Sequence, residues 1–235
     1  MPSVNTLKKM SAASGLVFGI FLAMHLFAHY MLNLGYEQAQ ETMLAFRVIY
    51  QHPIFELSLA ASLGVHMYSN TCLYLNRSKI NAQVKKETDG KKPAGSAELT
   101  AHRIAGYILS LSIFGHVFAT RLGAFIMLPD SSVYDYGFVA SVFEVVPFNL
   151  FPIYLCFFGM AGGWHLVYGT RSAIAILTGS SVVGKPVPVP LKVVAMINHV
   201  AIVAGMVALG KYLTTIDMSD KEDVRTKFFA DLGLH

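Results

Sequence analysis

Long apolar segments alternate with polar ones along the chain, and five of the apolar segments approach the roughly 20 residues that an α-helix needs to cross a bilayer. They lie near residues 12–34, 53–75, 103–127, 149–177 and 191–213. The pattern predicts an all-α fold: an integral membrane bundle of five transmembrane helices that forms a single domain over residues 1–235.

The polar segments predict the connections. Residues 76–101 contain few apolar side chains that could fold alone, so we expect a polar loop there. The segment GKPVPVP, residues 184–190, cannot continue a helix because of its prolines and is expected to be extended. The tail, residues 214–235, carries mixed charge and is expected at the surface.

The composition supports the membrane interpretation. Hydrophobic residues make up 54% of the chain and charged residues 14%, whereas a soluble domain carries about 25% charged residues. The two cysteines, Cys72 and Cys156, both lie in apolar runs. They form neither a disulfide framework nor a metal-ligand spacing, and the chain has no C-x-x-C-H motif for covalent haem attachment.

The basic residues predict the orientation. If five helices alternate in direction, twelve of the 18 Lys and Arg residues fall on the side of the N-terminus and six on the other side. Because basic residues are enriched on the inner side of membranes, we expect the N-terminus inside and the C-terminus outside.

An internal helix-pair repeat is suggested by two spacings. Gly15 precedes His25 by ten residues, and Gly106 precedes His116 by ten. Likewise, Pro-Ile-aromatic triplets begin thirteen residues before His66 and thirteen before His165. Each spacing ends on a histidine, which makes the histidines the candidate functional residues.

The four histidines fall at two depths. An α-helix rises about 1.5 Å per residue, so His25 and His116, on two helices of the same direction, are expected at nearly equal height. His66 and His165, on helices of the opposite direction, are expected at a second common height. Two neutral imidazoles on facing helices are the ligand set of a non-covalently bound haem b. We therefore expect two haem b groups, or one, with these histidines as axial ligands of the iron.

Other residues complete this hypothesis. Glycines on the helices leave room for a macrocycle: Gly15, Gly19, Gly64, Gly106, Gly115, Gly159, Gly162, Gly163 and Gly169. Arginines near helix ends are candidate partners of the haem propionates: Arg77, Arg103, Arg121 and Arg171.

Alternatives exist for individual residues. His29 lies one turn from His25 on the same helix face and is the rival ligand there. His199 has no partner at its depth and is expected to make a hydrogen bond. Histidines and small residues inside membranes also serve helix packing without any cofactor.

Three stretches resemble a known family. SAASGLVFGIFLAMH, AHRIAGYILSLSIFGH and FPIYLCFFGMAGGWHLVYGTR resemble helices of the five-helix, di-haem cytochrome b membrane anchors of succinate dehydrogenase and fumarate reductase, the second through the H-R-x-x-G signature. The resemblance covers roughly residues 10–215.

The resemblance implies a site and partners. One axial ligand from each of the first four helices falls on His25, His66, His116 and His165, paired His25 with His116 and His66 with His165. It implies a quinone site near Ser14, His102 and Arg103, and flavoprotein and iron–sulfur partner subunits. Lipid is a further partner, and no nucleic acid is expected.

The chain departs from the family at one position. Bacterial di-haem fumarate reductases carry a glutamate two residues before the fourth-helix histidine, where this chain has Gly163, so their proton path is in doubt here. The chain also resembles a related five-helix domain of fungal mitochondrial membrane proteins of lipid homeostasis, through the H-R-x-x-G pattern and a D-S element at Asp130.

These observations predict a haem b membrane anchor that passes electrons between partner subunits and membrane quinone, and that is not catalytic alone because it has no flavin or iron–sulfur motif. The alternative is a membrane scaffold of a mitochondrial complex or lipid-contact site on the same fold. The mitochondrial inner membrane is the favoured location, with a bacterial plasma membrane as the alternative.

Overall fold

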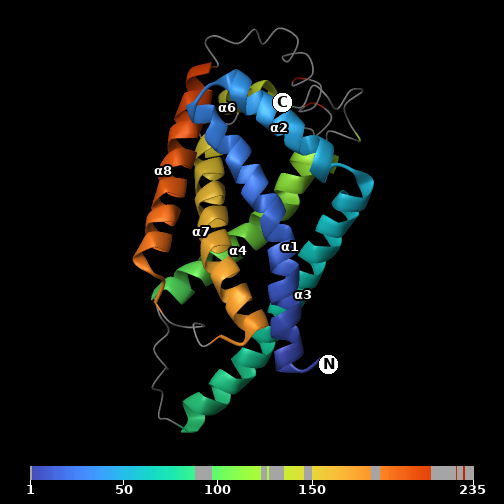
Figure 1. Cartoon of the computed structure of the whole chain (residues 1–235), viewed down its shortest axis with the longest axis vertical. Helices are drawn as coiled ribbons and strands as arrows, with labels where there is room; N and C mark the ends of the chain where they lie inside the picture. The colour runs from blue at the N-terminus through green and yellow to red at the C-terminus, as the bar shows by residue number, and fades with distance from the viewer. Residues whose placement is uncertain are drawn as a thin grey trace. The chain divides into compact units, whose positions relative to one another are not determined.

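The computed structural model of the chain describes residues 2–87, 97–122, 126, 135–145, 150–180, 186–212, 226 and 230. Within these ranges every regular element is helical, as predicted (Figure 1). The elements are α1 (Val4–Tyr30), the 3₁₀ turn η1 (Met31–Asn33), α2 (Tyr36–Tyr50), α3 (Pro53–Glu87), α4 (Ala97–Val117), the π-helical turn η2 (Phe118–Leu122), α6 (Tyr136–Val145), α7 (Leu150–Thr178) and α8 (Val189–Tyr212).

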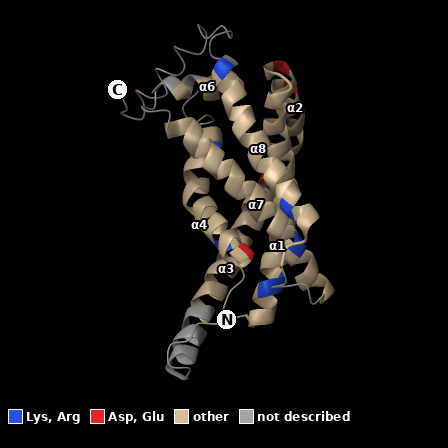
Figure 2. Cartoon of the chain, turned by 90° about the vertical axis from the view of Figure 1, so that its left-hand side faces the viewer, with Lys and Arg blue, Asp and Glu red and all other residues tan. Residues whose placement is uncertain are grey.

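Four helical segments in the described ranges are long and apolar enough to cross a membrane: Val4–Asn33, Ala97–Leu122, Leu150–Thr178 and Val189–Lys211. They correspond to the first, third, fourth and fifth predicted spans. In α1, α7 and α8 the charged residues lie toward the helix ends (Figure 2). The second predicted span lies in α3, where polar residues between Ser58 and Thr71 lower the mean hydropathy, and it is not one of the four. The length and apolar composition of these four segments are consistent with an integral membrane protein.

The predicted loop at 76–101 is wrong at both ends. Helix α3 continues to Glu87, and α4 already begins at Ala97. Residues 76–87 contain neither glycine nor proline, and more than half of them are Lys, Arg, Gln, Glu or Ala, which favour a helix without a continuous apolar run. Nearly all of the predicted surface tail, 214–235, lies outside the described residues, as do residues 184 and 185 of the predicted connector. The last two connector residues are already helical, because α8 begins at Val189 and a proline such as Pro190 is tolerated in the first turn of a helix.

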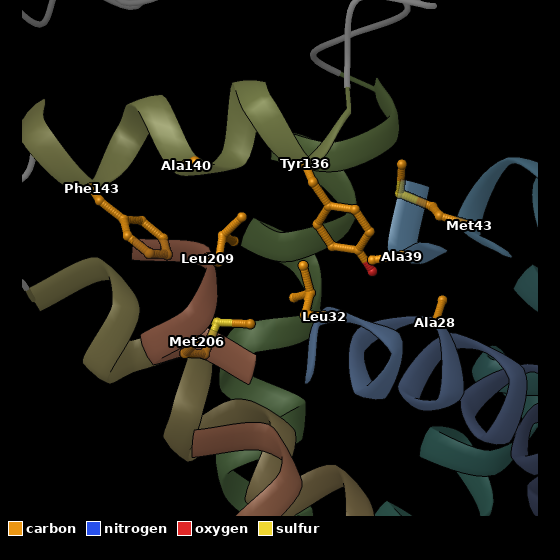
Figure 3. Close-up of a cluster of buried hydrophobic side chains, with 9 residues drawn as sticks. All are labelled: Ala28, Leu32, Ala39, Met43, Tyr136, Ala140, Phe143, Met206 and Leu209. Carbon is orange, nitrogen blue, oxygen red and sulfur yellow. The ribbon is translucent and has the colours of Figure 1, made fainter. Parts of the chain in front are cut away.

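Two helices were not predicted from the apolar pattern, α2 and α6. Both contribute to one hydrophobic cluster, in which Tyr136 of α6 lies beside Ala39 and Met43 of α2, and Phe143 of α6 lies toward Leu209 (Figure 3). The same cluster includes residues of α1, η1 and α8: Ala28, Leu32, Met206 and Leu209. Tyr136 is 1% exposed, so the short helix α6 packs on the bundle through its first residue.

The chain divides into two compact units, and several long helices contribute to both. Unit 1 comprises residues 1–24, 47–106 and 164–195, and unit 2 comprises residues 25–46, 107–163 and 196–235. The cluster in Figure 3 belongs to unit 2. His66 and His165 fall in unit 1, and His25 and His116 fall in unit 2. Each predicted ligand pair is therefore contained in a single unit.

Local signals set two of the helix ends. Pro53 occupies the first position of α3, where the missing N–H costs nothing because no helical carbonyl precedes it. Gly179 ends α7 with a φ of 73°, a left-handed conformation that glycine adopts without strain. The Ser180 amide then donates to the carbonyl of Ala175 at 2.9 Å, which closes the helix in a Schellman motif.

Candidate functional site: two histidine pairs

In unit 1 the imidazoles of His66 on α3 and His165 on α7 lie next to each other with nearly perpendicular planes. Their ring centres are 6.1 Å apart and their planes are inclined by 88°. Both rings are anchored through Nδ1 to a backbone carbonyl of a neighbouring helix: His66 to Ser11 of α1 at 2.9 Å, and His165 to His102 of α4 at 3.4 Å. A ring held through Nδ1 leaves Nε2 as the metal-binding nitrogen, which is the usual arrangement of histidine ligands.

Glycine allows each of these rings to approach its neighbouring helix. A Cβ atom added at Gly15 would lie 3.0 Å from ring atoms of His66, and one added at Gly106 would lie 3.2 Å from Cε1 of His165. These two glycines therefore accommodate imidazoles, whereas the sequence suggested that they leave room for a macrocycle. At Gly64 and Gly115 an added Cβ would meet no described atom within 4 Å.

The two anchoring arrangements have the same spacing. Ser11 precedes Gly15 by four residues, and His102 precedes Gly106 by four. One turn of helix thus supplies a carbonyl that binds an imidazole and a glycine that lets it approach. The carbonyl and glycine lie on α1 for His66 and on α4 for His165.

In unit 2 the ring centres of His25 on α1 and His116 on α4 are 5.8 Å apart, with planes inclined by 72°. His116 also packs on Phe158 of α7 at 5.0 Å between ring centres. Here the surroundings differ from those in unit 1, because Nε2 of His25 lies 3.3 Å from Nε2 of His29. Nδ1 of His29 in turn lies 3.1 Å from the hydroxyl of Tyr136. An iron atom bound to Nε2 of His25 would require the contact with His29 to open.

Both separations can be compared with the requirement of a shared iron. An imidazole nitrogen binds a first-row metal at about 2 Å and lies about 1.1 Å from its ring centre, so two axial ligands place their ring centres about 6 Å apart. The separations of 5.8 and 6.1 Å match this value. The ring separations are therefore compatible with a bis-histidine haem in each unit, although ring pairs in edge-to-face contact without a metal show the same separation. In the described ranges no group of three or more His, Cys, Asp or Glu residues is arranged to hold a metal ion.

The arginines predicted as propionate partners are distributed over both units. Arg103 and Arg171 belong to unit 1 and Arg121 belongs to unit 2. The guanidinium of Arg171 donates to the carbonyl of Pro186 at 3.2 Å. The backbone of Arg77 continues α3, but its side chain lies outside the described part of the chain.

The residues predicted at a quinone site, Ser14, His102 and Arg103, all belong to unit 1. The hydroxyl of Ser14, which is 8% exposed, donates to the carbonyl of Met10 at 2.7 Å and is thereby used within its own helix. The His102 ring stacks on His165, with ring centres 4.1 Å apart. Arg103 is half-buried. Of the three, Arg103 is the side chain best suited to meet a quinone.

Two further histidine and glycine positions have clear packing roles. His199 on α8 donates from Nε2 to the carbonyl of Met160 on α7 at 3.2 Å, which confirms the predicted hydrogen bond. Gly163 faces the carboxamide of Asn198, and a Cβ added there would overlap it. Oδ1 of Asn198 accepts a hydrogen bond from the hydroxyl of Tyr30. The notch at Gly163 is thus filled by an amide from α8.

Sequence reasoning missed the residues around the imidazoles. Ser11 could have been found, because its spacing from Gly15 repeats the spacing between His102 and Gly106. Tyr136 lies outside the predicted spans, and no periodicity relates it to His29.

No protein-family model matches the chain, and comparison with curated proteins and with solved structures gives no match.

Proposed function

We propose that the protein is a haem b-binding membrane anchor of a respiratory complex similar to succinate dehydrogenase or fumarate reductase, which passes electrons between iron–sulfur partner subunits and membrane quinone. The observation that carries the proposal is the pair of histidine contacts, His25 with His116 and His66 with His165, at ring separations of 5.8 and 6.1 Å. An iron shared by two axial imidazoles requires about 6 Å.

Haem supplies reversible one-electron transfer when it is bound. The residues of the chain bind and orient it. His66 and His165 each donate the Nδ1 proton to a backbone carbonyl and offer Nε2 to the iron. The apolar helices around the imidazoles exclude water, which favours the neutral ligand form. Arg103, Arg121 and Arg171 are proposed to neutralise propionates.

The proposed architecture includes α3 as a fifth span. It also includes an internal repeat, in which the helix pair α4 and α7 repeats the helix pair α1 and α3. The repeat is supported by the matching contacts of His66 with Ser11 and Gly15 and of His165 with His102 and Gly106. The fifth span is supported by His66, because a ligand on α3 must reach the same depth as its partner on α7.

The partners follow from what the chain lacks. It has two cysteines and no flavin-binding motif, so it holds neither the iron–sulfur centres nor the flavin that would exchange electrons with a soluble substrate. We propose that flavoprotein and iron–sulfur subunits supply these groups and that quinone is the membrane-side electron carrier.

The first test is the haem content. We expect about two haem b groups per chain, both low-spin, with the reduced-minus-oxidised optical spectrum of a bis-histidine cytochrome b. Because the ligand planes are inclined by 88° and 72°, the oxidised protein should give the highly anisotropic low-spin electron paramagnetic resonance signals of near-perpendicular imidazoles. A haem-to-protein ratio near zero after gentle purification would refute the proposal and favour the scaffold.

The second test concerns quinone. Arg103→Ala is expected to lower quinone-linked turnover at least tenfold with normal haem content, because a guanidinium stabilises the charge that develops on a quinone carbonyl during reduction. Turnover of the intact membrane complex and its haem content are measured together. Lys192→Ala, which removes a basic residue that pairs with Glu98 at 2.9 Å, is the matched control and should retain turnover.

The outcomes of the second test separate three roles. Normal turnover in Arg103→Ala would contradict a quinone site at this residue. Loss of haem together with turnover would make Arg103 a propionate partner. A parent complex that contains haem but has no quinone activity would leave the scaffold as the function.

The third test concerns orientation and location. We propose the mitochondrial inner membrane, with a bacterial plasma membrane as the alternative, and an N-terminus on the inner side. Twelve basic residues against six support this orientation. In sealed vesicles, a protease on the N-terminal side should cleave between residues 88 and 96, and cleavage from the other side would refute the topology.

A further inference from the structure

The His102 ring makes a contact that the proposed electron transfer does not explain. It stacks on the imidazole of His165 with ring centres 4.1 Å apart and planes inclined by only 14°. The carbonyl of the same residue accepts the Nδ1 hydrogen bond of His165 at 3.4 Å. One residue of α4 therefore restrains the imidazole of His165 both at its edge and on its flat face.

The His102 ring is itself held in place by α7. It stacks on Tyr168, which is 3% exposed, with ring centres 4.6 Å apart and planes inclined by 29°. Gly169 lies beside the His102 ring, and a Cβ atom added at Gly169 would lie 3.4 Å from Cε1 of His102. The position of the His102 ring is thus determined by packing.

Hydrogen bonding does not account for the burial of this ring. Nδ1 of His102 is buried and has no hydrogen-bond partner in the described part of the chain. A buried polar atom without a partner is unfavourable, so the ring must be retained for a contact that outweighs this cost. The stacking on His165 is the contact that its geometry provides.

Comparison with the other ligand of the same pair isolates the role of the ring. The carbonyl that binds His66 belongs to Ser11, whose hydroxyl accepts a hydrogen bond from Asn70 at 2.9 Å and has no ring to stack on an imidazole. A carbonyl alone therefore anchors Nδ1 of His66. At His165 the chain places an aromatic ring on the imidazole in addition.

We propose that His102 is a positioning residue whose ring fixes the plane of the His165 imidazole, and thereby holds the ligand planes of the unit 1 haem near perpendicular. This inference rests on the proposed haem-binding function. It assigns His102 to the ligand and not to quinone. Rotation of the His165 ring about its Cβ–Cγ bond would break the stacking on His102. The His102 ring therefore restricts this rotation more strongly than the Nδ1 hydrogen bond could by itself.

The experiment uses the purified holoprotein and three substitutions at one position. His102→Phe keeps an aromatic ring and removes both nitrogens, His102→Gln keeps polarity and similar length without a ring, and His102→Ala removes the side chain. All three keep the backbone carbonyl. Ile104→Ala is the matched control, because Ile104 lies two residues from His102 on α4, is 53% exposed and is assigned no contact with a proposed ligand.

The readouts are the low-spin electron paramagnetic resonance signal of the oxidised protein and the rate of haem transfer to excess apomyoglobin. We expect His102→Phe and the Ile104→Ala control to retain the parental anisotropic signal and haem-transfer rate. Gln and Ala should shift and broaden the signal of one haem and release that haem about tenfold faster, the size of effect typical of residues that orient a ligand. The signal of the His25 and His116 haem should not change.

Three outcomes would overturn the inference. If His102→Ala and His102→Gln both gave the parental signals and haem-transfer rates, the ring would have no orienting role. If His102→Gln kept the parental signal and haem-transfer rate and His102→Phe did not, the role would belong to hydrogen bonding and not to stacking. An equal change in Ile104→Ala would show that the effect is general to this turn of α4. If Ala does not fold, Gln and Phe decide the question. Haem missing from the parent would overturn the proposed function, and the inference with it, whereas the other outcomes leave that function intact.

Discussion

Replacing His165 by alanine is expected to halve the haem content of the purified protein, from about two groups per chain to about one. His165 and His66 share the ligand geometry of unit 1, with ring centres 6.1 Å apart. Loss of one axial imidazole leaves a single weak bond to the iron, so that haem should be lost during purification. The pair in unit 2, His25 and His116, should keep its haem, because both of its ligands lie within that unit.

The complementary variant and a control complete this test. His116→Ala should remove the other haem and leave the His66 and His165 signal. His199→Ala is the control, since His199 donates to the carbonyl of Met160 and is assigned no iron. Pyridine haemochrome quantification per mole of chain gives the ratio. Loss of both haems from either single variant, or of neither, would contradict two independent pairs.

The two haems should also differ in how firmly they are held. In unit 1 the hydrogen bonds of His66 and His165 use Nδ1, so Nε2 of each ring remains available for iron. In unit 2 the contact between Nε2 of His25 and Nε2 of His29 must first open, at a cost of about 0.5–1.5 kcal/mol. The unit 2 haem is therefore the one that should leave first during mild extraction.

Gly106→Leu is expected to remove the same haem as His165→Ala, although residue 106 binds no iron. A Cβ at this position would lie 3.2 Å from Cε1 of His165 and 3.5 Å from Nδ1, and the larger leucine side chain would extend further into the ring. The imidazole would have to move, and its hydrogen bond to the His102 carbonyl would be lost. Overpacking of this kind typically costs about 1–3 kcal/mol.

Ser110→Leu on the same helix is the matched control, because Ser110 is exposed and is assigned no role in haem binding. Haem content and the resonance signals of both variants are compared with the parent. Normal haem in Gly106→Leu would mean that the ring of His165 is free to move aside, and equal loss in Ser110→Leu would mean that any leucine on α4 perturbs the fold.

The helical class and four of the spans could be predicted because a helix needs about 20 consecutive apolar residues to cross a bilayer. Such a run is continuous in the sequence and can be recognised without knowledge of tertiary contacts. Helices α2 and α6 carry no such run. They fold because of what they pack against, as Tyr136 does in the core of unit 2, and contacts between distant segments leave no periodic signal. The helical residues 76–87 were missed because they contain no apolar run, and a polar stretch between two predicted spans favours a loop.

The pairing of the histidines could be predicted in the same way, because equal distances from helix ends place residues at equal depth. The contacts of His25 with His116 and of His66 with His165 agree with that pairing. The orientation of the rings could not be predicted. It depends on hydrogen bonds to the backbone carbonyls of Ser11 and His102. The repeated spacing to Gly15 and Gly106 marks these two positions, but it does not predict the planes of the rings.

The amide that fills the notch at Gly163 has a consequence for how this sequence can change over evolutionary time. Asn198 occupies the space that any side chain at position 163 would need, and it also accepts the hydrogen bond of Tyr30. A residue larger than glycine at 163 could not arise by one substitution without displacing the amide. Positions 163 and 198 should therefore co-vary, with glycine beside asparagine in some lineages and a larger residue beside a smaller one in others.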